Sequence, residues 1–137
     1  MYACVGFILV MGAIIGLCRG TTLADFQLCT GFFLFGFTYV ILALTQFLGL
    51  DLRLYGWYAF LVAVFSIVFG TVCVIGGTPF TAALWYMWAF LWGYGWVEYV
   101  LKKSFGPWST PVFCIVIGFL SAFLPGVLMF LGVWPEM

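Results

Sequence analysis

Four tryptophans recur in the segment ALWYMWAFLWGYGW, inside an uncharged run that covers residues 54–97. Indole offers a flat apolar face and one N–H donor. At about 100° per residue, a helix places all four rings within roughly an 80° arc of one face. Such a stack would line a slot that passes a flat, neutral, hydrogen-bonding solute and excludes ions. Periodicity alone favours the simpler interpretation, which is packing on helices or lipid, and both interpretations stay open for these residues: Trp85, Trp88, Trp92 and Trp96.

A second aromatic stripe lies in FFLFGFTY, where Phe35 and Tyr39 are four residues apart and share one helix face. If the two stripes face each other, they enclose a narrow dry channel with a few polar tips. Periodicity does not determine whether they do. Three further residues continue this second face: Phe32, Leu42 and Gln46.

Side chains that could do acid–base, metal or ion-coupled chemistry are sparse. The chain has four basic and four acidic residues and no histidine, and none lies near the centre of a long apolar run. Ion pathways usually need such a group inside the membrane, so we expect neither a pump nor an ion-coupled transporter. The five cysteines are scattered singly, without metal-ligand or redox spacing. We therefore expect a non-enzyme with no metal, no cofactor and no nucleic-acid partner, acting on a neutral solute.

The elements that must position the aromatic residues are membrane helices. Of the residues, 67% are hydrophobic and 6% charged, whereas a soluble domain carries about 25% charged residues. The run 54–97 would measure roughly 66 Å as one helix, about twice the bilayer core. It must therefore fold back, and GGTP, residues 76–79, is the natural turn. The sequence predicts an all-α integral membrane protein with five spans, at about 2–18, 27–49, 55–75, 81–101 and 110–132.

Basic residues predict the orientation, because cytoplasmic loops are enriched in them. Arg53, Lys102 and Lys103 fall on one side, whereas Arg19 stands alone on the other. We therefore place the first side in the cytoplasm. We expect the protein in the plasma (bacterial inner) membrane. Pro125 should bend the last span. Rows of small residues four apart predict close helix contacts: Gly12 with Gly16, Ser66 with Gly70, Ala89 with Gly93, and Gly118, Ala122 and Gly126.

Three segments resemble the AmiS/UreI family, which comprises the acid-activated urea channel and short-chain amide transporters. LFGFTYVILALTQFLGLDLRLYGWYAFLVAV is similar to the family's third and fourth helices. ALWYMWAFLWGYGWVEYVLK resembles the fifth, including its W-x-x-W-x-x-L-W register. TPVFCIVIGFLSAFLPGVLMF resembles the sixth, with an initial Thr-Pro and an internal proline.

The resemblance implies a six-helix bundle with one pore in each protomer of a hexameric ring. It implies passive conduction of urea or short aliphatic amides across a lipid bilayer. Glu98 and Gln46 would be polar pore-end or structural residues, and Trp96, without a family counterpart, would be an interfacial anchor. The implied pore-lining residues are Phe35, Tyr39, Trp85, Trp88, Leu91 and Trp92.

The chain departs from the family pattern at three points. YACVGFIL resembles the start of the second helix, so residues 1–137 are expected to form one transmembrane channel domain that is N-terminally incomplete and lacks the first helix. Ile117 replaces a polar residue of the last helix, which leaves the choice between urea and longer amides open. Without histidine, we expect no histidine-based acid gating. The alternative function is a structural or assembly membrane protein whose aromatic stripes only pack.

Overall fold

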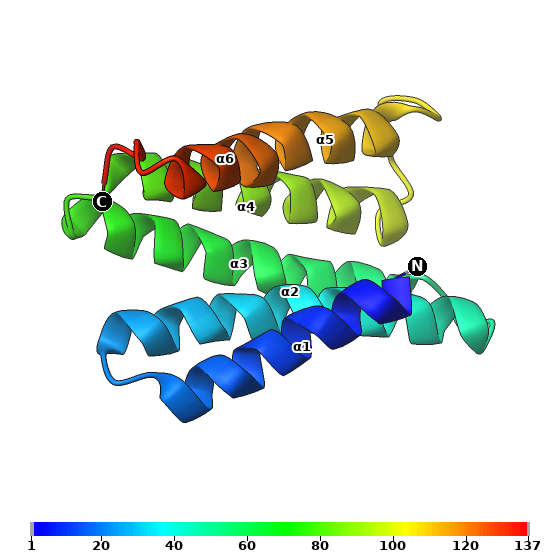
Figure 1. The fold of residues 1–137 in the computed structure, drawn as a ribbon. Coiled ribbons are helices and arrows are strands. Elements are labelled where there is room, and N and C mark those ends of the chain that lie inside the picture. Colours follow the sequence, from blue (N-terminus) through cyan, green and yellow to red (C-terminus); the bar gives the residue numbers. More distant parts are fainter. Residues whose placement is uncertain (1, 137) are drawn as a thin grey trace. The chain divides into compact units, whose positions relative to one another are not determined.

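A computed structural model describes residues 2–136, and every regular element in that part of the chain is helical (Figure 1). The chain divides into two compact units after Tyr58. The helices, in order, are α1 (Tyr2–Arg19), α2 (Leu23–Phe47), α3 (Arg53–Ile75), α4 (Pro79–Tyr99), α5 (Ser109–Gly118), the π-helical turn η1 (Phe119–Phe123) and α6 (Leu124–Phe130).

The five predicted spans correspond to these helices, with α5, η1 and α6 forming the last one. In the described part of the chain, α1, α2, α3 and the continuous Ser109–Phe130 segment are long and apolar enough to cross a bilayer. The remaining predicted span, α4, has 21 residues. Its tryptophans and tyrosines lower its mean hydropathy because they are amphipathic. The turn predicted at GGTP is also present. Gly77 has φ +78° there, a conformation that glycine adopts without strain.

The start of α2 was predicted four residues too late. Thr22 and Asp25 form a capping box in which the Thr22 hydroxyl accepts from the Asp25 N–H (3.2 Å) and the Asp25 carboxylate accepts from the Thr22 N–H (2.9 Å). This reciprocal cap satisfies N–H groups that a helix start leaves open. The helix therefore begins at Leu23, before the first residue of the apolar run.

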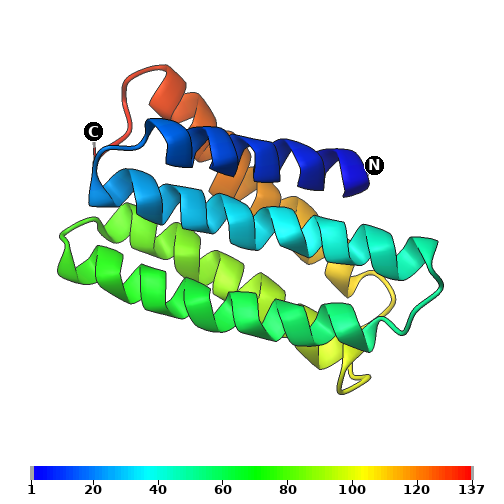
Figure 2. The same ribbon diagram turned by 90° about the horizontal axis from the view of Figure 1, so that it is seen from below.

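In the first unit, α1 and α2 lie side by side and antiparallel (Figures 1 and 2). Two glycines lie at close contacts between them. A Cβ built on Gly6 would lie 2.8 Å from Val40 Cγ2, and one on Gly36 would lie 2.8 Å from Val10 Cγ2. The predicted small-residue row is only partly correct here, because Gly16 abuts Cys29 whereas Gly12 has open space around it.

In the second unit, α3 and α4 also meet through small residues. The Cβ of Ala59 lies 3.8 Å from a Cβ built on Gly95, and a Cβ on Gly70 would lie 2.8 Å from the Tyr86 ring. Such close backbone approach stabilises helix pairs in lipid, where no hydrophobic driving force brings helices together. In the described part of this single chain, a Cβ built on Gly118 or Gly126 would have no neighbour within 4 Å, so the predicted row of the last span makes no close contact there.

The last span, which Pro125 is expected to bend, has an irregular turn directly before this proline. Leu124 donates its N–H to the Phe119 carbonyl, five residues back, so the backbone forms one π turn. Proline has no N–H to continue the ordinary four-residue ladder. The π turn therefore lies directly before the proline, and such turns occur often at functional sites.

Candidate pore residues

Six residues were predicted to line the pore, and all six are half-buried, on α2 in the first unit and on α4 in the second. On α4, the rings of Trp85 and Trp88 meet edge to face, with centroids 5.1 Å apart and planes at 87°. The Trp85 ring also lies 4.9 Å from the ring of Phe69 on α3. Edge-to-face pairing is favoured by the aromatic quadrupole. The α3–α4 pair therefore holds these two indoles in defined orientations.

The N–H of Trp88 is engaged within the protein. It donates to the Ser121 hydroxyl at 2.7 Å, and that hydroxyl donates to the Ile117 carbonyl at 2.5 Å. The single donor of this indole is therefore satisfied by η1. At the level of Trp88, the tryptophan stripe presents ring surface to whatever lies beside it.

Leu91 and Trp92 stand one turn further along α4 and are also half-buried. Trp96 packs on Phe60 of α3, with ring centroids 5.2 Å apart. Trp96 therefore packs within the α3–α4 pair, and its role as an interfacial anchor stays a prediction.

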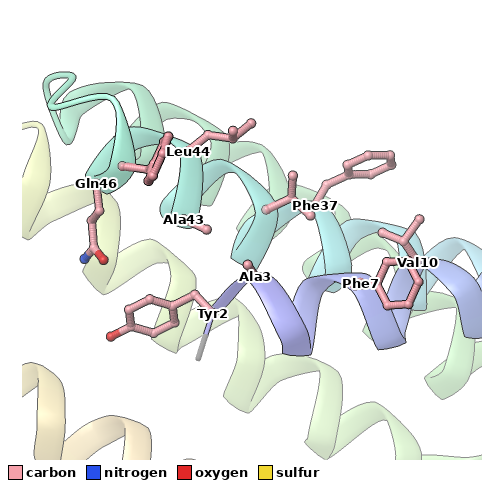
Figure 3. Close-up of a pocket in the computed structure, with 10 residues that line it drawn as sticks. Tyr2, Ala3, Phe7, Val10, Phe37, Ala43, Leu44 and Gln46 are labelled. Carbon is pink, nitrogen blue, oxygen red and sulfur yellow. The ribbon is translucent and has the colours of Figure 1, made fainter.

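In the first unit, Tyr39 stacks on Tyr2 of α1, with ring centroids 6.4 Å apart and planes at 17°. Gln46 is exposed and lines an open groove of about 790 Å³ between α1 and α2. Figure 3 shows that the Tyr2 hydroxyl and the Gln46 amide lie near the same end of this groove, whereas Phe7 and Val10 line its apolar part. The Tyr2 hydroxyl and the Gln46 amide thus form the polar end of a mostly apolar groove.

Glu98 joins α4 to α5, because its carboxylate accepts a hydrogen bond from the Thr110 hydroxyl. The role predicted for Glu98, a polar pore-end or structural residue, stays a prediction. A second polar cluster lies one turn away, where buried Tyr94 bonds to Ser109 and to the backbone of Phe105.

Sequence reasoning missed three polar residues that bind across elements, namely Ser121, Tyr94 and Glu136. Only Ser121 had a signal in the sequence. It stands four residues before Pro125, whose missing N–H interrupts the helix ladder at that turn. Among the described residues, no group of three His, Cys, Asp or Glu side chains could hold a metal ion.

The fold and these contacts define a class, which is a multi-pass integral membrane protein whose helices carry uncharged aromatic stripes. The sequence model for AmiS/UreI family transporters matches residues 1–133. The chain belongs to the AmiS/UreI family.

Two curated relatives resemble the chain. Both are described as acid-activated urea channels, from Helicobacter pylori strain J99 and strain ATCC 700392 / 26695. Each is 34% identical over 113 residues, which is 74% of this chain and 57% of the relative. The chain therefore spans little more than half the length of these relatives. No solved structure gives a significant match.

Proposed function

We propose that this chain forms a passive channel for urea or short aliphatic amides, with an aromatic-lined pore inside each protomer. The observation that carries the proposal is the half-buried, uncharged stripe on α4, formed by Trp85, Trp88, Leu91 and Trp92. Family membership and the described activity of the Helicobacter relatives support urea as the solute. Phe35 and Tyr39 of α2 complete the proposed lining.

A planar amide suits a slot made of ring surfaces. Its flat face packs against the rings, and its N–H groups form weak contacts with their π-faces. An ion cannot pass in the same way, because removing its hydration shell in an apolar slot is very costly without a paired charge. The slot therefore selects flat, neutral, hydrogen-bonding solutes and conducts them down their gradient.

The assembly is part of the proposal. A hexameric ring in the lipid bilayer follows from the family resemblance, with one pore per protomer. The competing function is a structural or assembly role, in which the same aromatic residues only pack against helices and lipid. The two differ in what the loss of a single deep indole does to solute flux.

Trp92→Ala separates the two functions. The chain is reconstituted in liposomes, and urea permeability is measured by stopped-flow light scattering. If the chain is a channel, Trp92→Ala should change urea permeability severalfold, while the oligomer should elute unchanged in size-exclusion chromatography. Trp57→Ala is the matched control, because Trp57 lies on α3 and is 55% exposed. Urea flux no greater than that of protein-free liposomes would exclude the channel function, and flux abolished by an uncoupler would indicate ion coupling.

A further inference from the structure

Ser121 occupies a buried position between the last span and α4. Its side chain is only 3% exposed, and it lies within η1, the one π turn among the described residues. A π turn places one more residue in the turn than an α-helix does, which rotates the helix face by about 100°. Within this turn, the hydroxyl of Ser121 accepts a hydrogen bond from the indole of Trp88 on α4.

The direction of both hydrogen bonds follows from the chemistry of the groups. An indole N–H only donates, so Trp88 donates to the Ser121 oxygen at 2.7 Å. The Ser121 proton is then directed to the Ile117 carbonyl at 2.5 Å. The hydroxyl therefore uses its donor and one acceptor position at once, and it ties the indole to the backbone of α5.

The Trp88 ring is held at a second point by its edge-to-face contact with Trp85. A tryptophan side chain has two rotatable bonds, χ1 and χ2. Ring packing on one side and a directed hydrogen bond on the other fix the tilt of the indole. Without the hydroxyl, packing alone would set it.

We propose that Ser121 is a positioning residue, which orients the Trp88 ring and thereby sets how the pore discriminates urea from bulkier amides. This inference rests on the proposed channel function. Because the Trp88 N–H is bonded to Ser121, the solute meets ring surface at this level and is selected there by size and shape. Ile117 takes part in this pair of hydrogen bonds only through its backbone carbonyl, so its apolar side chain does not interrupt them.

The test is the ratio of urea permeability to propionamide permeability in liposomes, because a ratio does not depend on how much protein inserts. Ser121→Ala removes the acceptor of the Trp88 N–H. We expect the ratio to fall roughly three- to tenfold, which corresponds to the loss of one neutral hydrogen bond. Ser121→Thr keeps the hydroxyl and should restore the ratio to within about twofold of wild type.

Ser66→Ala is the matched control. Ser66 is fully buried on α3, and its hydroxyl donates to the Val62 carbonyl in the same four-residue pattern at 2.8 Å. In the described part of the chain this hydroxyl bonds to no tryptophan, so its loss should leave the ratio unchanged. Equal ratio changes in Ser66→Ala and Ser121→Ala would overturn the proposal.

A double variant tests whether Ser121 acts through the indole. If it does, adding Ser121→Ala to Trp88→Phe should change the ratio no further, because phenylalanine has no N–H to orient. Additive effects, or a Ser121→Ala variant that slows both solutes equally, would reduce Ser121 to a packing role and overturn the inference while leaving the channel intact.

An alternative variant is available if Ser121→Ala does not assemble. Ser121→Cys is then tested in its place, since a thiol fills a similar volume but accepts hydrogen bonds only weakly. The same fall in the ratio is expected for it. A wild-type chain without urea flux would refute the proposed function and this inference together, whereas wild-type flux with unchanged ratios would refute the inference alone.

Discussion

At the scale of single residues, Tyr94 controls the shape of the connection between α4 and α5. Its side chain is 6% exposed. Its hydroxyl accepts from the Phe105 N–H at 3.1 Å and lies 2.6 Å from the Ser109 hydroxyl. Ser109 donates to the Gly106 carbonyl at 2.7 Å, so Tyr94 is the donor to Ser109. One phenol therefore organises a connection that has no regular structure.

Tyr94→Phe should destabilise the protein by about 0.5–1.5 kcal/mol, because it removes the hydroxyl that accepts from the Phe105 N–H in a part-buried hydrogen bond. The measurement is thermal or denaturant unfolding in detergent, followed by circular dichroism. Tyr86→Phe is the control, since Tyr86 is 40% exposed and its hydroxyl makes a longer bond of 3.3 Å to Thr71. We expect a change within about 0.5 kcal/mol for that surface position. Equal stability of the two variants would show that water replaces the Tyr94 hydroxyl.

At the scale of elements, the start of α4 is held by the far end of the chain. Glu136 accepts hydrogen bonds from the Phe80 N–H (2.5 Å), the Thr81 N–H (3.0 Å) and the Thr81 hydroxyl (2.6 Å). The ring of Trp134 packs against Phe80, with centroids 6.3 Å apart. A carboxylate at a helix N-terminus is favoured by the helix dipole and by the open N–H groups. The segment after α6 thus caps α4.

This cap predicts a pH dependence of stability. Desolvation raises the pKa of Glu136, but the hydrogen bonds from Thr81 and Phe80, with one from Trp134, outweigh it and lower the pKa below its ordinary value of 4.5. A carboxyl whose pKa is lowered by folding stabilises the native state above its unfolded pKa, and this contribution is lost as pH falls through the lowered value. Wild type should therefore be more stable than Glu136→Gln at neutral pH, and the difference should vanish well below pH 4.5.

The readout for the cap is the difference in unfolding midpoint between wild type and Glu136→Gln, measured from pH 7 to pH 3. Asp51→Asn is the comparison at pH 7, because the ion pair of Asp51 with Arg53 is exposed and 3.8 Å long. Exposed pairs of this kind contribute little. A difference that stays constant across the whole range would show that the carboxylate charge does not matter to the cap.

At the scale of the whole molecule, the sequence predicts elements better than contacts. Apolar runs and the Gly-Pro turn place all five spans, since each depends on local composition. The contact between Gly6 and the Val40 side chain could not be predicted in this way, because it depends on which helix faces meet. The cap by Glu136 joins residues 55 positions apart, and no local pattern encodes such a pair. The tryptophans of the stripe were identified from the sequence, but the bond from Trp88 to Ser121 joins residues 33 positions apart and has no local pattern.

The complete charge inventory of the chain leads to a prediction about gating. There is no histidine among the 137 residues, and histidine is the side chain whose ordinary pKa lies between pH 5 and 8. The Glu136 carboxyl, with its lowered pKa, stays ionised over that range. Urea permeability of the reconstituted chain should therefore change by less than about twofold between pH 7 and pH 5, where a histidine gate titrates.

Stopped-flow measurement of urea flux at matched protein density tests this prediction directly, with protein-free liposomes at each pH as the control. A steep rise toward pH 5 would contradict the prediction.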